Sequence, residues 1–253
     1  MNSPLETPSR IALAGDWHAN DRWAACAIDY AKDEGADVII HVGDFAYDYS
    51  RKFLMTVDRA LADYGIPLLF VEGNHDDPGA LRGPLGPDGL RQLAPHIWHI
   101  PRGFRWQWGD VTFLGCGGAH SVDRQRRTPG VSWWPEEAIT DEDVRRCVDG
   151  GPVDVLISHD CPTGVTIPGI DDASSPPYWP ALEILRATEH RAVLRQIVDG
   201  CQPRTIVHGH YHRFYETVAE LGYGAVRVMG LDCDGGDFAA NVQVVDLKDL
   251  AAT

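Results

Sequence analysis

The sequence predicts an α/β fold in which two mixed β-sheets pack face to face and are flanked by helices. In the first part of the chain, short apolar runs alternate with amphipathic stretches of helical length, which is typical of a parallel sheet. Further on, more short apolar runs follow with one long helical stretch among them, which indicates a second sheet. The 253 residues contain no internal repeat and no low-complexity linker, so we expect one domain over residues 1–253.

The N-terminal elements are predicted in the order strand, helix, strand, helix, strand. Three apolar runs are interpreted as buried strands: residues 10–14, 37–42 and 67–71. Two stretches carry apolar side chains at helical spacing, residues 21–34 and 51–64, and Asp21 is the expected N-cap of the first helix. In a parallel sheet of this kind, functional loops lie at the carboxyl ends of the strands.

The middle of the chain changes character. Three short strands of a meander are predicted at residues 97–100, 103–108 and 111–115. A further buried strand is expected at residues 153–158, and one long helix at residues 180–199.

The tail is predicted to be mostly strands, with a strand over residues 204–207 that ends in a histidine-rich turn and antiparallel strands between residues 213 and 247. Two long irregular stretches, residues 120–137 and 161–180, each follow a strand end. Loops of this length in a compact domain are usually functional or disordered, and we expect both to wall the same cleft.

The composition narrows the class of partner. Acidic residues number 37 against 22 Lys and Arg, which makes a formal net charge of -15. Proteins that grip nucleic acid through its phosphates usually carry a basic face, so an extended nucleic-acid footprint is not expected. An anionic substrate would instead need bound cations, which are often the largest local charges in a site.

The same sequence predicts a cytoplasmic protein. The six cysteines are scattered without a C-x-x-C pair, which is typical of free thiols in a reducing compartment. The chain has no apolar run of about eighteen residues, so no membrane-spanning helix is expected. The N-terminus lacks the basic start and apolar stretch of a secretory signal. The oligomeric state stays open.

Five short motifs with metal-ligand side chains follow five of the predicted strands. Each supplies Asp, Asn or His, the oxygen and nitrogen ligands that suit Mn, Fe, Zn and similar ions. Taken alone, each has a structural alternative: an aspartate can cap the next helix, Gly-Asp is usually a turn, and Ser-His can be a turn histidine. Their order at successive strand ends favours a metal site. The motifs are Asp16-Trp17-His18, Gly43-Asp44, Gly73-Asn74-His75-Asp76, Ser158-His159 and Gly209-His210-Tyr211-His212.

This set of motifs resembles that of the calcineurin-like metallophosphoesterase superfamily. The resemblance runs from Asp16 to His212, with every ligand motif in the family's order, and Gly-Asn-His-Asp is its most specific part. It implies a single metallophosphoesterase domain with a four-layer α/β/β/α sandwich. It also implies an enzyme that hydrolyses phosphate esters with two metal ions.

The resemblance implies a role for each matching residue. The implied ligands of the first metal are Asp16, His18 and His212. The implied ligands of the second metal are Asn74, His159 and His210. Asp44 would bridge both ions, His75 would act as general acid, and Asp76 would orient His75.

The chemistry of two neighbouring cations agrees with these roles. Two ions roughly 3.5–4 Å apart can activate a water and clamp the oxygens of an in-line displacement at phosphorus. Ions that close need an anionic bridge, which one carboxylate such as Asp44 supplies. The two ligand aspartates cancel about half of the ions' formal charge, which leaves a cationic pocket for a phosphate ester. Mn²⁺ is the favoured metal, and Fe, Zn, Ni and Co are alternatives.

Details of the motifs narrow the type of phosphoesterase. Ser/Thr phosphatases of the family usually show Gly-Asn-His-Glu and an Arg soon after Gly-Asp, whereas this chain has Asp76 and the sequence Phe-Ala-Tyr-Asp. Purple acid phosphatases place a tyrosine ligand where Tyr47 stands, but they lack the histidine of the first motif. Tyr47 is therefore interpreted as a tyrosine packed near the ligands. The resemblance that remains is to the bacterial and phage phosphodiesterase branch.

That branch leads to a substrate hypothesis. We expect a Mn²⁺-dependent phosphodiesterase acting on small phosphodiesters or nucleotides, with 2′,3′-cyclic nucleotides as a leading candidate. Arg126 and Arg127 are candidates for bidentate phosphate binding and Trp133 for stacking a base, with a solvated basic turn and loop packing as alternatives. His120, near the expected cleft, is a further candidate. His208 alternates with the two ligands that follow it and is interpreted as a core residue or one behind the ligands.

Other functions stay open. The same core could serve a phosphomonoesterase or a DNA or RNA nuclease, although a nuclease would need a basic groove or a partner that supplies one. The fold could also act as a non-catalytic protein-binding scaffold. Such members tend to lose ligands or the acid, and this chain retains them all.

Overall fold

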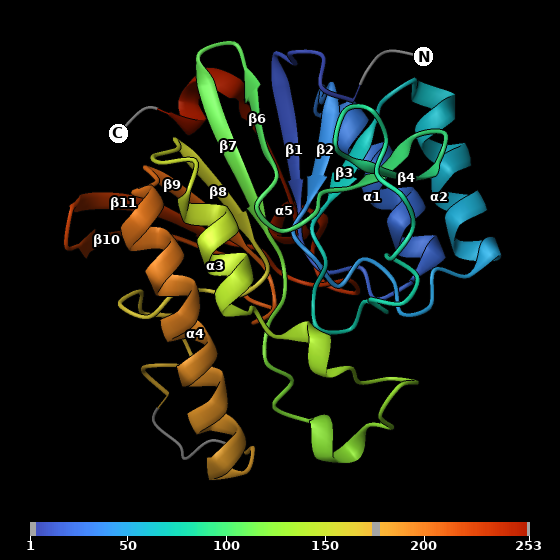
Figure 1. The fold of residues 1–253 in the computed structure, drawn as a ribbon. Helices are drawn as coiled ribbons and strands as arrows, with labels where there is room; N and C mark the ends of the chain where they lie inside the picture. The colour runs from blue at the N-terminus through green and yellow to red at the C-terminus, as the bar shows by residue number, and fades with distance from the viewer. Residues whose placement is uncertain (1–3, 174–177, 252–253) are drawn as a thin grey trace.

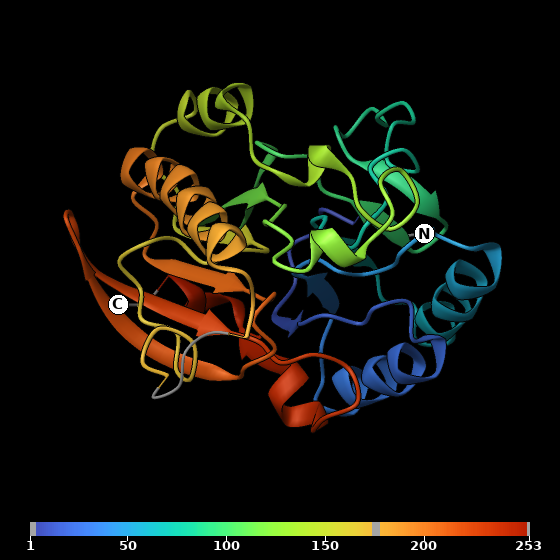
Figure 2. The ribbon, with the colours of Figure 1, turned by 90° about the horizontal axis from the view of Figure 1, so that it is seen from below.

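The computed structural model describes residues 4–173 and 178–251 and contains two six-stranded β-sheets with helices on both outer faces (Figure 1). Viewed from below, helices, sheet, sheet and helices follow one another as layers (Figure 2). This four-layer α/β/β/α sandwich confirms the predicted fold class.

The first sheet has the strand order β12-β1-β2-β3-β5-β4. Its four central strands run parallel, and the two edge strands pair antiparallel to their neighbours. The strands are β1 (Arg10–Ala14), β2 (Val38–His41), β3 (Leu68–Phe70), β4 (Arg91–Ala94), β5 (Ile97–His99) and β12 (Val242–Asp246).

The second sheet has the strand order β10-β11-β9-β8-β7-β6. Again the four central strands run parallel and the edge strands pair antiparallel. The strands are β6 (Arg105–Trp108), β7 (Val111–Cys116), β8 (Val155–Ser158), β9 (Thr205–His208), β10 (Tyr215–Leu221) and β11 (Gly224–Gly230).

Two helix pairs cover the outer faces of the sheets. α1 (Asp21–Asp33) and α2 (Arg51–Tyr64) pack on the first sheet, and α3 (Asp141–Val148) and α4 (Ala181–Cys201) pack on the second. Neither α4 nor any other helix in the described part of the chain has the length and apolar character of a membrane span. The short helical turns are η1 (Arg124–Arg126), η2 (Pro135–Glu137), α5 (Phe238–Asn241) and η3 (Leu247–Leu250).

The side chains of β1 show how the sequence builds the layers. Alternate residues of a strand point to opposite faces. Ile11 and Leu13 join the buried cluster between the sheets, which includes Trp108 and Phe113 of the second sheet. Ala12 and Ala14 point the other way, and their small size lets α1 and α2 lie close to the strand. Burying each large apolar side chain contributes roughly 1.5–3 kcal/mol, so this central cluster holds the two sheets together.

The structure differs from several local predictions. Asn20 caps α1, because its Oδ1 accepts a hydrogen bond from the Trp23 amide at 3.2 Å; the prediction of Asp21 was wrong. The predicted meander was also wrong. β5 pairs with β3 in the first sheet, whereas β6 and β7 belong to the second, so the chain changes sheets after β5.

The elements that were not predicted include the edge strand β4 and the helix α3. α3 begins with a capping box between Thr140 and Asp143, a sequence signal that could have identified it. In the tail, β10 and β11 form the predicted antiparallel pair, but β12 returns to the first sheet beside β1.

Candidate metal centre

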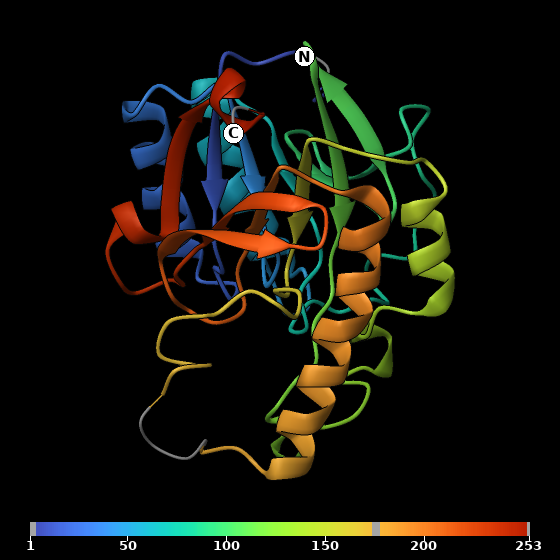
Figure 3. The same ribbon diagram turned by 90° about the vertical axis from the view of Figure 1, so that its left-hand side faces the viewer.

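The predicted ligand motifs lie where the carboxyl ends of the two sheets meet. β1, β2 and β3 of the first sheet lead into the first three motifs, and β8 and β9 of the second sheet lead into the other two. This edge lies at the bottom of the sandwich in Figure 1. Figure 3 shows the first turns of α4 projecting below the same edge. Residues far apart in the sequence are thus brought together by parallel strands that end side by side.

Asp44 stands at the centre of the cluster. Its Oδ2 lies 3.5 Å from His18 Nε2, and its Oδ1 lies 3.3 Å from His159 Nε2. The two carboxylate oxygens therefore face ligands on opposite sides, as a bridging carboxylate would. His159 Nε2 also lies 3.1 Å from Asn74 Oδ1.

Three overlapping groups of side chains have ligand atoms within 4.8 Å of one another. They are Asp16, His18 and His212; His18, Asp44 and His75; and Asp16, Asp44 and His159. His212 Nε2 lies 3.1 Å from Asp16 Oδ2. His210 reaches the cluster differently, since its ring lies 5.1 Å from that of His159 and its backbone N–H donates to Asp16 Oδ2 at 3.1 Å.

The backbone of the loops that carry the predicted ligands adopts a conformation that is rare for residues other than glycine. Four of the predicted ligand residues have a positive φ, a conformation that costs most side chains free energy and that is frequent at functional sites. They are His18 (46°), Asp44 (53°), His210 (69°) and His212 (51°). Gly73 is required for a different reason, because a Cβ there would overlap both the backbone nitrogen and Oδ1 of Asp44.

Hydrogen bonds behind the cluster orient two of its side chains. His159 Nδ1 lies 2.8 Å from the Val42 carbonyl, so Nδ1 carries a proton and the neutral ring has its lone pair on Nε2. Asn74 donates from Nδ2 to Ser121 Oγ at 3.0 Å, and the Ser121 hydroxyl donates to Glu137 at 2.5 Å. The amide oxygen of Asn74 is thereby turned toward His159. Sequence reasoning did not identify Ser121 or Glu137, since neither belongs to a motif.

The electrostatics test whether these residues fit metal ions. Burial opposes a charged His159 ring, but the Asp44 carboxylate outweighs burial and raises the pKa of His159 to about 10. Against the same burial, Asp44 raises the pKa of His18 to about 9. The carboxylates thus create a strongly negative potential at these rings, which favours positive charge. With its oxygen and nitrogen donors, the centre fits a pair of divalent cations.

Asp76 was predicted to orient His75, but the structure shows no hydrogen bond between these two side chains. The Asp76 carboxylate accepts hydrogen bonds from the Gly73, Phe45 and Ala46 amides and from the Tyr49 hydroxyl. Burial and the nearby Asp44 raise the pKa of Asp76 to about 7. Asp76 therefore ties the second and third ligand loops together through their backbone.

The His75 ring contacts Arg127 instead. Arg127 Nη2 donates to His75 Nε2, and Arg127 Nη1 reaches the Asn74 carbonyl at 3.5 Å. His75 Nε2 also lies 3.9 Å from Asp44 Oδ2. Of the four predicted substrate contacts, Arg127 is thus the one that the structure brings to the cluster.

The other three candidates have protein partners. Arg126 lies over Tyr178 and Trp179, with its carbon Cζ 5.0 and 5.3 Å from their ring centroids. Trp133 is half-buried with Arg124 over its ring at 5.6 Å.

The expectation for His120 needs correction. Its ring is buried, and Nε2 lies 2.9 Å from Glu183 of α4. His120 therefore joins the 120–137 loop to α4 through a hydrogen bond inside the protein, and burial lowers the pKa of its ring.

His208 and Tyr47 lie near the predicted ligands, one buried in the protein and the other at the surface. His208 is fully buried and bonds through Nε2 to the Tyr215 hydroxyl at 2.6 Å, as expected of a residue behind the ligands. Tyr47 is 43% exposed, and its ring centroid lies 5.4 Å from that of His75. Tyr47 was expected to be packed or to lie just behind the ligands; its ring does lie beside the cluster, but it is partly exposed.

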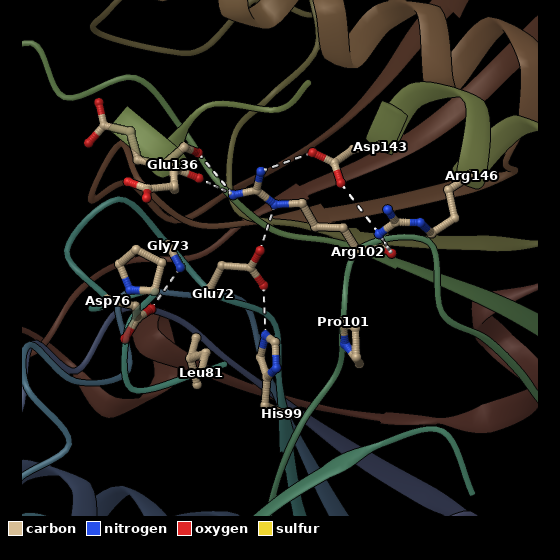
Figure 4. A pocket seen from close by; sticks show the side chains of 12 residues that line it. Glu72, Gly73, Asp76, Leu81, His99, Pro101, Arg102, Glu136, Asp143 and Arg146 are labelled. Atoms are coloured by element: carbon tan, nitrogen blue, oxygen red, sulfur yellow. Dashed lines mark hydrogen bonds and ion pairs between the residues drawn. The ribbon is translucent and has the colours of Figure 1, made fainter. Parts of the chain in front are cut away.

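A pocket of about 220 Å³ lies next to the loop that carries Gly73 (Figure 4). Several of the charged side chains that line it are paired with one another. Arg102 donates from Nε to Glu72 at 2.6 Å, and His99 Nε2 lies 2.8 Å from the other oxygen of Glu72. Burial works against a charged Glu72, but Arg102 and His99 hold the pKa of this carboxyl well below its usual range. This network anchors the start of the third ligand loop.

The comparisons with known proteins agree with this fold. Among solved structures, the TT1561 protein of Thermus thermophilus matches with a TM-score of 0.56 and 14% identity, over 95% of this chain and 99% of that chain. A dimetal phosphatase from Danio rerio matches with a TM-score of 0.55 and 14% identity, over 97% of this chain and 93% of that chain. At these identities the likeness shows the fold alone.

No curated protein matches this chain. The model of the calcineurin-like phosphoesterase family, however, matches residues 9–214, from before the first strand to just after the last ligand motif. The chain therefore belongs to the calcineurin-like phosphoesterase family.

Proposed function

We propose that this protein is a phosphodiesterase that uses two divalent metal ions, with Mn²⁺ favoured, to hydrolyse small phosphodiesters such as 2′,3′-cyclic nucleotides. The observation that carries the proposal is the convergence of carboxylate, amide and imidazole ligands around Asp44, directly beside His75 and Arg127. An acidic protein needs such a cationic centre to attract an anionic substrate.

The ligand set divides into two metal sites. The ligands proposed for the first ion are Asp16, His18 and His212, and those for the second are Asn74, His159 and His210. Asp44 would contact both ions through its two oxygens. When bound, the ions would activate a water for attack on phosphorus and neutralise charge on the phosphate.

His75 and Arg127 are proposed to act on the substrate itself. His75 lies beside Asp44 without being one of the proposed ligands, so its Nε2 can hold a proton for the departing oxygen. Arg127 would bind the phosphate, since its guanidinium already reaches His75 and has planar donors that match phosphate oxygens. Both groups would then contact the same phosphodiester.

Two exposed aromatic side chains, one beside the cluster and one beside Arg126, favour a nucleotide over a plain phosphodiester. Tyr47 is 43% exposed beside the His75 ring, and Tyr178 is 75% exposed beside Arg126. Aromatic faces of this kind can stack a base, which is worth roughly 1–3 kcal/mol per base. We propose Tyr47 as the nearer stacking surface.

Two alternatives use the same centre. A phosphomonoesterase is one, and the structural neighbour from Danio rerio is itself named a phosphatase. A nuclease is the other, but the net charge of -15 works against a long nucleic-acid substrate.

An assay of the Mn²⁺-reconstituted protein on p-nitrophenyl phosphate, bis(p-nitrophenyl) phosphate, the 2′,3′-cyclic nucleotides and single-stranded DNA tests the proposal. We expect the diesters to be turned over with the highest kcat/KM, and the cyclic nucleotides to release 2′- or 3′-nucleotides. Faster turnover of the monoester would favour a phosphomonoesterase, and no turnover of any ester would refute the proposed function.

A further inference from the structure

We propose that Asp234 is a positioning residue for the first metal of the proposed centre, because it holds the His18 ring so that Nε2 faces the metal. The inference rests on the proposed two-metal function. Asp234 lies between β11 and α5, beyond residues 9–214 that the family model matches. It therefore belongs to a part of the chain to which the family comparison assigns nothing.

Three contacts tie Asp234 to the first ligand loop. Its Oδ1 lies 2.9 Å from His18 Nδ1, and its Oδ2 accepts a hydrogen bond from Asn20 Nδ2 at 2.8 Å. Its backbone N–H donates to the Asp16 carbonyl at 2.8 Å. Both carboxylate oxygens and the backbone of Asp234 are thus directed at the loop that supplies Asp16 and His18.

These contacts select one tautomer of His18. A carboxylate can only accept, so Nδ1 carries a proton, and the neutral ring that binds a metal then has its lone pair on Nε2. Nε2 lies on the side of Asp44, 3.5 Å from Oδ2. Carboxylates that bond the far nitrogen of a metal-binding histidine fix its orientation in this way.

Asn20 fixes the rotation of the Asp234 carboxylate in turn. The Asn20 amide oxygen caps α1 by accepting from the Trp23 amide, so its nitrogen is left pointing at Asp234. A helix cap, an acidic side chain and a metal-binding histidine are therefore coupled in one chain of hydrogen bonds.

The segment that carries Asp234 is itself anchored. Asn241, which is fully buried, accepts from Trp17 Nε1 at 3.0 Å through its side chain and from the Gly15 amide at 2.8 Å through its carbonyl. Its Nδ2 donates to the Asp232 carbonyl at 2.7 Å. The C-terminal segment is thereby held against both sides of Asp16, which keeps Asp234 in place.

Binding of Mn²⁺ to the purified full chain tests the inference, measured by equilibrium dialysis with elemental analysis and by the electron paramagnetic resonance of bound Mn²⁺. We expect Asp234→Asn to weaken the binding of one of the two metal ions by about 10–100-fold and to leave the affinity for the other unchanged. This is the usual effect of removing a hydrogen-bond partner of a metal ligand. The Mn²⁺ spectrum should change from that of a coupled pair to that of a single ion at concentrations that fill both sites in the unsubstituted chain.

Two further variants make the test specific. Asp232→Asn removes the same charge from the same segment, but the side chain of Asp232 accepts from the Cys233 amide and not from His18. It should keep both metals. Asn20→Ser keeps a capping side chain on α1 while removing the donor to Asp234, and it should weaken the binding of the same metal ion as Asp234→Asn does.

The outcomes separate this inference from the proposed function. Two metals of unchanged affinity in both Asp234→Asn and Asn20→Ser would overturn the inference alone. An equal loss in Asp232→Asn would also overturn it, because general charge would then be the cause. Fewer than two Mn²⁺ on the unsubstituted chain would overturn the proposed function, and this inference with it.

Discussion

The guanidinium of Arg127 donates a hydrogen bond from Nη2 to Nε2 of His75, and the same Nη2 lies 2.7 Å from Asp123 Oδ1. Burial lowers the pKa of His75; Asp44 opposes this, and the Arg127 cation adds to it. The pair joins the 120–137 loop to the third ligand loop. A phosphate that draws Arg127 toward itself would free Nε2 of His75 to hold a proton.

Removing the Arg127 cation should weaken substrate binding and catalysis together. Arg127→Gln loses the charge that would pair with the phosphate, so we expect kcat/KM for a cyclic nucleotide to fall by roughly 10–100-fold. Arg126→Gln is the control, since Arg126 faces Tyr178 and not His75. Steady-state kinetics of both variants measure the difference. Equal losses would argue that the loop, rather than Arg127, is responsible.

Removing the imidazole of His75 should leave the metals in place but slow the departure of poor leaving groups. We expect His75→Ala to cost about 10²–10⁴-fold with alkyl diesters, because general acid catalysis matters most for poorly stabilised leaving oxygens. Aryl diesters with acidic leaving groups should be affected far less. A series of substrates with graded leaving-group pKa measures this slope. Uniform slowing across the series would count against His75 as the acid.

Replacing Asp44 should abolish metal binding and activity in the same variant. Asp44→Asn keeps the shape of the side chain but removes the negative charge that two adjacent cations need between them. We expect less than one Mn²⁺ per chain by elemental analysis after dialysis, with activity reduced in parallel. Asp48→Asn, an exposed aspartate from the same loop, should retain both. Full metal content in Asp44→Asn would contradict the bridging role.

The lowered pKa of Asp143, which lies away from the metal centre, should make the free energy of unfolding depend on pH. Burial works against its charge, but hydrogen bonds from Thr140 and the Arg102 cation hold the pKa of Asp143 below its usual value. A carboxyl whose pKa is lowered on folding stabilises the protein above the unfolded pKa, about 3.9. That stabilisation is lost as the pH falls through the folded pKa.

We therefore expect Asp143→Asn to lower the free energy of unfolding by about 1 kcal/mol at pH 7, the value expected when a carboxylate in the first turn of a helix loses its charge. The difference from the unsubstituted chain should shrink as the pH approaches 3. Urea titrations at both pH values measure it, with the exposed Asp149→Asn at the end of the same helix as the control. A difference that does not depend on pH would rule out the charge of Asp143 as the cause.

Much of the fold was predictable because its signals are local. The strand 10–14 and the helix 51–64 were placed with their observed bounds, since apolar spacing over one element depends on that element alone. The meander at 97–115 was predicted wrongly because which sheet a short strand joins depends on distant neighbours. β5 pairs with β3, and no pattern within the residues of β5 itself encodes that choice.

The amino-acid sequence was enough to predict the family, the layers and the candidate ligands, because each candidate follows a strand and parallel strands end at one edge. What lies behind those candidate ligands depends on the tertiary structure. In the tertiary structure Arg127, and not Asp76, bonds to His75, and His120 bonds to Glu183. Asp234 bonds to His18 although the two residues are 216 positions apart in the chain. Such contacts depend on how the two sheets pack and on where the C-terminal segment lies, and the spacing of residues within one element predicts neither.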